Sequence, residues 1–422
     1  AIYLSKHPLS SITLLQHKRI ILAATGSIAV YKAVDLASKL TQAGALIDVV
    51  MTEAAQRFVT PLTFQAVTGR PVYTDMWQAD ASGGLPTHIA HVGLAEGADL
   101  LAVVPATANT LAKLAQGQAD DLLSVTALAA RCPLLLAPAM DGGMYEHPAT
   151  QANVQTLVQR GAQLIEPESG RFASGLVGRG RLPETPTLLG YIRRVLGQHT
   201  QSSLLGRRVV VTAGGTREAI DPVRYITNHS SGKQGYAVAQ AAIDAGAQVT
   251  LISSASLPTP VGADLIAVDS AQAMRDAVIE QVTQADVLVM AAAVADFRPA
   301  LRSEQKLKKQ SGVPTLELAS NPDILLDVKA LKAQREESAL PRVVVGFAAE
   351  SQNLLQNAEG KLKRKALDLL VANDISADDA GFAVDTNRVT ILDRDGGQET
   401  IDLTSKAAIA EHLMARIAAL LT

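Results

Sequence analysis

The chain has 422 residues, of which 48% are hydrophobic and 19% charged, with a formal net charge of −3. This length exceeds one ordinary domain, so we expect two or three. The near-neutral charge gives no general electrostatic basis for binding nucleic acid or an anionic membrane. A single cysteine, Cys132, excludes an internal disulfide framework. With no apparent signal peptide or membrane span in the sequence, we expect a cytoplasmic protein.

The first clear element is a strand from Arg19, which a glycine-containing turn joins to an amphipathic helix. The helix ends near Gly44, and residues 46–52 form a second strand. The apolar residues of this helix recur at helical spacing, at Val30, Val34, Ala37 and Leu40. Strand, turn, helix and strand in this order are the opening of a βαβ unit.

The same order returns in the second half of the chain. Residues 208–216 read as a strand and a glycine turn, 235–246 as a helix, and 248–254 as the next strand. Two such openings predict an α/β fold with two Rossmann-like parallel-sheet domains.

A polar stretch at residues 197–203 resembles a short linker. It favours two domains, residues 18–196 and 206–422, over the alternative of one large doubly wound sheet. Ligands of open α/β sheets bind beyond the carboxyl ends of the strands, so polar clusters there mark candidate sites. Further short apolar strands are expected at residues 100–105, 133–138, 287–294, 343–348 and 369–373.

Two such clusters lie in the first half. Gly26 and Ser27 occupy a strand-to-helix turn, where backbone N–H groups and a small hydroxyl can hold a phosphate. The segment Pro105–Thr110 (PATANT) directly follows an apolar strand and offers hydrogen bonds to a ring or a phosphate. Thr107 can at the same time be the N-cap of a helix.

Five segments in order resemble the flavin-containing cysteine decarboxylase family over about the first 195 residues. They are TGSIAVYK, MTEAAQRFVTPLTFQAVTGR, HIAH, PATANT and PAMDGGMY. The resemblance implies that His88 is the catalytic base and that FMN is bound. The implied FMN-binding residues are Gly26, Ser27, Thr52, Pro105, Ala106, Thr107, Ala108 and Asn109.

Two positions depart from that family's pattern. Asp141 stands where the family usually has Asn, and an ionised Asp would repel a substrate carboxylate. Ser174 stands where the substrate flap usually has a proton-donating Cys, and a hydroxyl is a much weaker acid than a thiol. Cys132 precedes a buried strand and is expected to be a small core residue. We expect FMN and substrate binding to be retained, with another residue supplying the acid.

The alternatives for the first half remain open. It could be a flavoprotein of altered substrate or incomplete turnover, or mainly an FMN-binding oligomerisation scaffold. In related proteins it forms trimers with flavin at the subunit contacts, while ligase domains pair as dimers. A homo-oligomer of trimeric and dimeric units is therefore expected.

The densest motif of the second half runs from Thr212 to Ala239. Its glycines permit close backbone approach, and Asn228, Ser230 and Lys233 supply donors before a helix. It is neither G-x-G-x-x-G nor a P-loop, which argues against a nicotinamide dehydrogenase. Its many clustered polar residues indicate a ligand site rather than an elaborate turn.

From Gly206 onward the chain closely resembles phosphopantothenate–cysteine ligase, with NPDIL, VVGFAAES and LLVANDIS also matching. Both halves in this order resemble the bacterial bifunctional phosphopantothenoylcysteine decarboxylase/phosphopantothenate–cysteine ligase family. The resemblance implies 4'-phosphopantothenate, cysteine and CTP as substrates, an acyl-cytidylate handled by Asn228, and Mg²⁺ with Lys306 on the phosphates. The implied CTP contacts are Met290, Ala291, Ala292, Asp296, Lys306, Asn321, Pro322, Asp323, Ile324, Phe347, Lys361 and Lys365.

Overall fold

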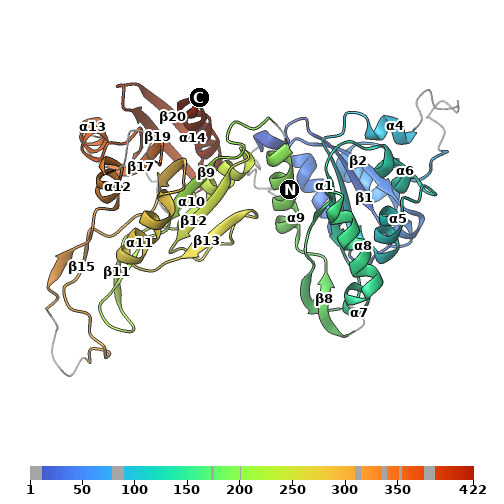
Figure 1. Ribbon diagram of the computed structural model, residues 1–422, viewed down its shortest axis with the longest axis horizontal. Coiled ribbons are helices and arrows are strands. Elements are labelled where there is room, and N and C mark those ends of the chain that lie inside the picture. The colour runs from blue at the N-terminus through green and yellow to red at the C-terminus, as the bar shows by residue number, and fades with distance from the viewer. Residues whose placement is uncertain are drawn as a thin grey trace, which may run out of the picture. The chain divides into compact units, whose positions relative to one another are not determined.

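A computed structural model describes most of the chain (Figure 1). The described residues are 12–77, 90–172, 175–199, 201–308, 315–334, 340–350, 354–374 and 385–422. The chain divides into two compact units, Ala1–His199 and Thr200–Thr422. None of the described helices is both long and apolar enough to cross a bilayer.

The first unit is built on a parallel six-stranded sheet of order β3-β2-β1-β4-β5-β6. Its strands are β1 (Arg19–Ala24), β2 (Leu46–Met51), β3 (Val72–Tyr73), β4 (Leu100–Ala106), β5 (Leu134–Pro138) and β6 (Gln163–Leu164). Its helices are α1 (Val30–Gln42), α2 (Glu53–Gln56), α3 (Pro61–Thr68), α4 (Ala90–Ala95), α5 (Ala108–Gln116), α6 (Leu122–Ala129), α7 (Gly142–Glu146), α8 (Pro148–Gln159) and α9 (Thr185–His199). A hairpin of β7 (Glu168–Arg171) and β8 (Val177–Arg181) stands apart from the sheet.

Successive residues of β1 belong to two separate hydrophobic cores, because side chains alternate between the faces of a strand. Ile20 and Leu22 pack with α1, α3 and α9 on one face. Ile21 and Ala23 pack with α4, α5, α6 and α8 on the other face, where half-buried Cys132 also lies. Both faces are covered, as a parallel sheet requires.

The second unit has an eight-stranded sheet of order β13-β12-β9-β14-β17-β18-β19-β20, parallel up to β18. Its strands are β9 (Arg208–Ala213), β12 (Gln248–Ser253), β13 (Ala263–Ala267), β14 (Val287–Met290), β17 (Val343–Glu350), β18 (Leu369–Asp374), β19 (Thr386–Asp393) and β20 (Gln398–Ser405). α10 (Lys233–Asp244) and α14 (Lys406–Leu421) cover one face. α11 (Ala271–Val282), α12 (Ile324–Ala333) and α13 (Leu354–Lys365) cover the other.

Two small antiparallel ribbons complete the second unit. β10 (Arg217–Ala219) pairs with β11 (Tyr225–Thr227), and β15 (Phe297–Pro299) pairs with β16 (Leu318–Ser320). Both ribbons follow the carboxyl ends of sheet strands, β9 and β14, in the chain.

The predicted α/β fold with two parallel sheets is confirmed, and three local expectations need correction. The strand expected at residues 287–294 ends at Met290, because Ala293 instead donates to Gly214 O at 2.8 Å in a loop. The expected linker begins too early, since α9 continues to His199. Within α1, Ala33 and Leu36 are buried where Val34 was expected, and Val34 packs only partly against the core.

Candidate active sites

A cavity of about 760 Å³ lies at the carboxyl ends of the first sheet. Its size is within the range of ligand pockets, about 300–1,000 Å³. Its lining residues come from the segments after β1, β2, β4 and β5, including α5, and from the connection between α5 and α6. They are Gly26, Ser27, Thr52, Glu53, Ala54, Arg57, Thr107, Ala108, Asn109, Thr110, Lys113, Asp120, Asp121, Ala139, Met140 and Met144.

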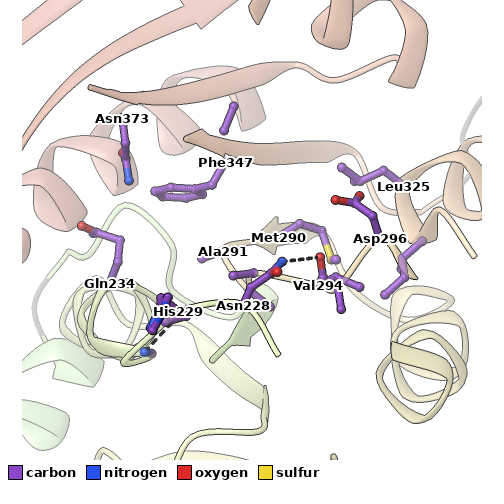
Figure 2. A pocket seen from close by; sticks show the side chains of 18 of the residues that line it. Asn228, His229, Gln234, Met290, Ala291, Val294, Asp296, Leu325, Phe347 and Asn373 are labelled. Carbon is purple, nitrogen blue, oxygen red and sulfur yellow. Dashed lines mark hydrogen bonds between the residues drawn. The ribbon is translucent and has the colours of Figure 1, made fainter. Parts of the chain in front are cut away.

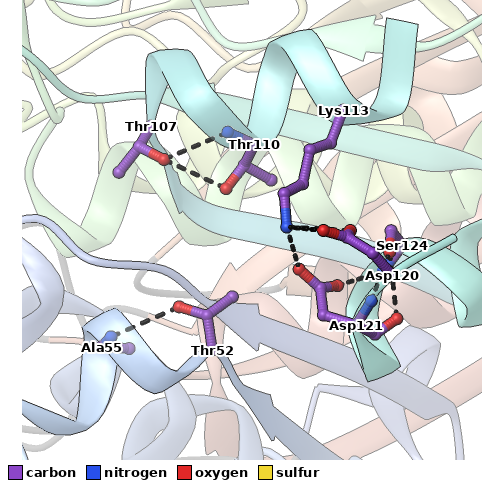
Figure 3. A network of polar contacts seen from close by, with 8 residues as sticks. All are labelled: Thr52, Ala55, Thr107, Thr110, Lys113, Asp120, Asp121 and Ser124. Carbon is purple, nitrogen blue, oxygen red and sulfur yellow. Dashed lines mark hydrogen bonds and ion pairs between the residues drawn. The ribbon is translucent and has the colours of Figure 1, made fainter. Parts of the chain in front are cut away.

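Two threonines shape the polar edge of this cavity by capping short helices. Thr52 Oγ1 accepts a hydrogen bond from Ala55 N, and Thr107 Oγ1 accepts one from Thr110 N, each at 3.3 Å (Figure 3). The N-cap expected at Thr107 is confirmed. Each cap fixes a helix start, and helix starts present unpaired N–H groups that suit an anion.

The turn at Gly26 needs glycine for steric reasons. A Cβ at this position would lie 2.5 Å from Ala54 Cβ, so only glycine allows the turn to approach α2 so closely. Buried Thr25, which sequence reasoning missed, ties the neighbouring strand ends together: its hydroxyl donates to Pro105 O at 2.7 Å and accepts from Thr107 N at 3.2 Å. A phosphate-bearing ring cofactor fits this arrangement of turns and hydroxyls.

A charged network on the cavity wall was also missed. Lys113 Nζ lies 2.9 Å from carboxylate oxygens of both Asp120 and Asp121 (Figure 3). Its pKa is raised by the hydrogen bonds to these two carboxylates. Burial raises the pKa of Asp121, but hydrogen bonds from Ser124 and Lys113 outweigh it and the pKa is lowered. The signal in the sequence was Asp121-x-x-Ser124, a reciprocal capping box at the start of α6.

The remaining predicted residues of the first half have different placements. Pro105 and Ala106 lie within β4 and do not line the cavity. Asp141 is the N-cap of α7, where its Oδ1 accepts from Gly143 N at 3.2 Å, and the adjacent Met140 lines the cavity. A carboxylate at a helix N-terminus is stabilised by the unpaired N–H groups. His88 and Ser174 lie outside the described residues.

A second cavity, of about 650 Å³, lies at the carboxyl ends of the second sheet (Figure 2). It is lined by residues 228–235, 290–296 and 321–325, and by Phe347, Ala348, Lys361, Lys365, Asn373, Asn387 and Lys406. In Figure 2, Gln234 and Asn373 lie to one side of the Phe347 ring, and Asp296 and Leu325 lie to the other. The structure therefore brings together every predicted residue of the ligase half except Lys306.

Amides hold the loops of this cavity in place. Asn228 Nδ2 donates to Val294 O at 3.1 Å, so the β11–α10 segment is joined to the loop after β14 (Figure 2). Asn321 Nδ2 donates to Ala295 O at 2.8 Å, and its backbone N–H donates to Asp296 O at 2.8 Å. Asn228 therefore has a structural contact and also faces the cavity.

The cavity is rich in lysine. Lys361 and Lys365 line it from one face of α13, as their spacing predicted, and Lys365 Nζ lies 3.0 Å from Asp323 Oδ2. Lys406, at the start of α14, is buried, and burial followed by the charge of Lys233 lowers its pKa, although Asp385 opposes this. Clustered lysines suit a ligand that carries several negative charges.

Lys306 is exposed and does not line the cavity. It lies in the connection between β15 and β16, which is fixed to the β10–β11 turn on both sides of Lys306. Ser303 N donates to Ile220 O at 2.9 Å, and Leu307 N donates to Asp221 Oδ2 at 3.2 Å.

Comparisons with known proteins match both halves of the chain. The Flavoprotein family model matches residues 9–197, and the model of the DNA/pantothenate metabolism flavoprotein C-terminal domain matches residues 204–421. The coenzyme A biosynthesis bifunctional protein CoaBC of Bacillus subtilis is 47% identical over 409 residues, covering 96% of this chain and 98% of that protein. The chain belongs to this bifunctional coenzyme A biosynthesis family.

A second bifunctional relative gives the same result. The CoaBC protein of Mycobacterium tuberculosis H37Rv is 46% identical over 414 residues, which cover 95% of this chain and 97% of that protein. The crystal structure of the FMN-dependent cysteine decarboxylase SpaF is 35% identical, covers 43% of this chain and 97% of that chain, and has a TM-score of 0.37. As a member of the family, the chain is a bifunctional phosphopantothenoylcysteine decarboxylase and ligase with an FMN-binding flavoprotein domain.

Proposed function

We propose that the cavity of the second unit uses CTP to activate 4'-phosphopantothenate and then joins it to cysteine. The observation that carries this proposal is the convergence of Asn228, Asp296, Phe347, Lys361 and Lys365 on one cavity, although they are far apart in the chain. Phe347 offers an aromatic face to a base, and the lysines offer charge to phosphates and carboxylates.

In the first half-reaction, a carboxylate oxygen of phosphopantothenate attacks the α-phosphorus of CTP, and pyrophosphate leaves. In the second, the amine of cysteine attacks the acyl carbon, CMP leaves, and the amine loses a proton. Negative charge builds on phosphoryl oxygens in the first step, so cationic side chains lower its barrier. Asn228 is assigned to the acyl-cytidylate because its amide faces the cavity beside the loop of Asp296.

Mg²⁺ is assigned to the nucleotide phosphates rather than to a cage of protein ligands. Among the described residues there is no cluster of three or more His, Cys, Asp or Glu side chains that could hold a metal. Mg²⁺ commonly uses substrate phosphates and waters with only one or two carboxylates, and Asp296 is a carboxylate of this cavity.

Pyrophosphate release tests the ligase assignment. We expect release to require both CTP and phosphopantothenate, and to begin before cysteine is added. Release with ATP at an equal or higher rate would overturn the choice of CTP. Release that requires cysteine from the outset would overturn the two-step order.

For the first unit, we propose that the cavity binds FMN and that phosphopantothenoylcysteine is decarboxylated beside it. Gly26, Ser27, Thr52, Thr107, Ala108 and Asn109 would hold the cofactor, since all six line the cavity. Bound FMN supplies the two-electron oxidation and re-reduction of the substrate. The protein orients the substrate and moves protons, and the base is assigned to His88 by the resemblance of its segment.

Asp141 can fix the start of α7 although the family usually has Asn at this position. Its carboxylate accepts a backbone hydrogen bond at the start of α7, a role that Asn also performs. We therefore expect decarboxylation to occur. Mixing the yellow protein with phosphopantothenoylcysteine should bleach the flavin absorbance only transiently and yield equal amounts of CO₂ and phosphopantetheine.

Other outcomes of that experiment separate the alternatives. CO₂ without phosphopantetheine would mean that the reductive step fails, as loss of the usual cysteine at Ser174 could cause. Absence of both bleaching and CO₂ would favour an FMN-binding scaffold for the ligase and would refute the decarboxylase assignment.

We also propose an assembly of trimeric first units and dimeric second units. Exposed large apolar side chains in each unit support it: Ile28, Tyr31, Phe58, Leu62 and Trp77 in the first, and Val223, Tyr225, Phe297, Leu301 and Leu318 in the second. Contacts of both kinds in one closed assembly require a number of chains divisible by six. Light scattering of the purified chain should give such a mass, and a monomer would contradict the proposal.

A further inference from the structure

The β7–β8 hairpin is attached to the loop that lines the flavin cavity. Met140 N donates to Gly180 O at 3.0 Å, and Met140 is itself a lining residue. The next residues of that loop are Asp141 and Gly142, where α7 begins. The position of the hairpin and the position of Asp141 are therefore linked through one short segment.

The ring of Phe172 fills a slot made by three glycines between the hairpin and this loop. A Cβ on Gly142 would lie 3.3 Å from Phe172 Cε2, and one on Gly178 would lie 3.2 Å from the same atom. A Cβ on Gly180 would lie 3.3 Å from Phe172 Cε1 and would collide with Met140 O. A side chain at Gly180 would therefore collide with the backbone of Met140, and a side chain at Gly142 or Gly178 would have to displace the ring by a few tenths of an ångström.

Phe172 also closes the end of the hairpin. Its backbone N–H donates to Leu176 O at 2.8 Å, and its carbonyl accepts from Gly175 N at 3.0 Å. The same side chain thus contacts the α7 loop while its backbone joins the two arms of the hairpin.

The side chain of Arg179 contacts Glu166, in the connection between β6 and β7, and Tyr145, in α7, rather than the Met140–Gly142 loop. Arg179 Nη2 lies 2.5 Å from Glu166 Oε2, and the guanidinium is 5.7 Å from the centre of the Tyr145 ring. Both side chains of the ion pair are about half exposed, so solvent and salt weaken the attraction. The packed ring and the Met140–Gly180 backbone hydrogen bond therefore hold the hairpin on the loop.

We propose that Phe172 is a positioning residue of the decarboxylase: seated among Gly142, Gly178 and Gly180, it holds the β7–β8 hairpin on the Met140–Gly142 loop and so fixes Met140 in the wall of the flavin cavity. This inference rests on the proposed function of the first unit. Phe172 and the three glycines do not line the cavity, so they act through Met140, which does.

Phe172→Ala tests the anchor in the full-length protein. We expect the KM for phosphopantothenoylcysteine to rise at least tenfold, while FMN content and CTP-dependent pyrophosphate release remain within twofold of wild type. Phe172→Leu should restore most of the loss, because Leu still fills part of the slot. Val158→Ala, an exposed change on α8, is the matched control and should leave all readouts unchanged.

A double-mutant cycle separates anchoring from general damage. Gly142→Ala should raise the KM because its methyl group crowds the ring, and Gly142→Ala with Phe172→Leu should be no worse than Phe172→Leu alone. The proposal would be overturned if the losses of the two single variants were fully additive, or if the KM of Phe172→Ala stayed within twofold of wild type. It would also be overturned if the FMN content fell as the KM rose.

Trypsin sensitivity gives a readout that needs no decarboxylase activity. The hairpin contains Arg171, Arg179 and Arg181, and release of the anchor should speed cleavage there at least fivefold in Phe172→Ala. Faster cleavage in a protein whose wild type releases no CO₂ would support the anchor while refuting the proposed function. Unchanged cleavage would overturn the anchor whatever the activity.

Discussion

The lysines around the ligase cavity differ in their surroundings, and these differences predict different roles. Lys365 is paired with Asp323 inside the cavity, Lys406 is buried with a lowered pKa, and Lys306 is exposed outside it. A cation already held in place loses little side-chain entropy when a phosphate or base binds. Lys365 should therefore contribute mainly to nucleotide affinity.

Replacing Lys365 by Gln removes this cation and should raise the KM for CTP by about 10- to 100-fold, since a hydrogen bond to a charged group is worth about 1.5–3 kcal/mol. Steady-state kinetics of pyrophosphate release measure the change. Lys363→Gln, on the exposed side of the same helix, is the control and should stay within twofold. Equal effects of the two substitutions would show that general charge, not position, matters.

Lys306 should act on the reaction rather than on the fold. Lys306→Gln is expected to abolish CTP-dependent pyrophosphate release and to leave the unfolding transition unchanged, because the side chain is exposed. Circular dichroism and the pyrophosphate assay give the two readouts. Wild-type rates in this variant would refute the assignment of Lys306 to the phosphates.

At the scale of elements, one buried carboxylate joins the β10–β11 turn to the segment that bears Lys306. Asp221 accepts hydrogen bonds from Val223 N and Arg224 N at 2.8 Å each, from the Arg224 guanidinium, and from Leu307 N. Burial acts to raise the pKa of Asp221, but these hydrogen bonds outweigh it and hold the pKa well below its usual range. The ionised form is therefore the one that the folded protein stabilises.

This gives a pH-dependent prediction. The folded pKa lies below the unfolded value of about 3.9, so the contribution of Asp221 is present above about pH 4 and is lost as the pH falls toward the folded pKa. Asp221→Asn should lower the denaturant midpoint at pH 7, with the difference from wild type narrowing below pH 4. The exposed Asp269→Asn is the control. A difference that does not vary with pH would contradict the argument.

Elements of regular apolar pattern were predictable, and those defined by distant contacts were not. The strands at Arg19, Leu100 and Leu369 follow from their continuous apolar runs. The end of β14 could not be predicted from its apolar run. The chain leaves the strand after Met290, and Ala293 N donates to the carbonyl of Gly214, which is far away in the sequence. Lys406 and Asn387 were missed as cavity residues because antiparallel strands β19 and β20 bring the end of the chain back to the site.

At the scale of the whole molecule, each unit has a cavity at the carboxyl ends of the parallel strands of its sheet. The two βαβ openings predicted both sheets and the edge at which each cavity lies. The predicted reactions came from the resemblance of both halves to known families, because periodicity and composition do not identify a reaction. In the proposed order of reactions, the product of the second unit is the substrate of the first.

A coupled assay tests this account most directly. Purified protein is supplied with phosphopantothenate, cysteine and CTP, and pyrophosphate, phosphopantothenoylcysteine, CO₂ and phosphopantetheine are quantified over time. We predict that pyrophosphate, CO₂ and phosphopantetheine rise to equal amounts, with phosphopantothenoylcysteine appearing only transiently. Accumulation of phosphopantothenoylcysteine without CO₂, or no pyrophosphate at all, would contradict it.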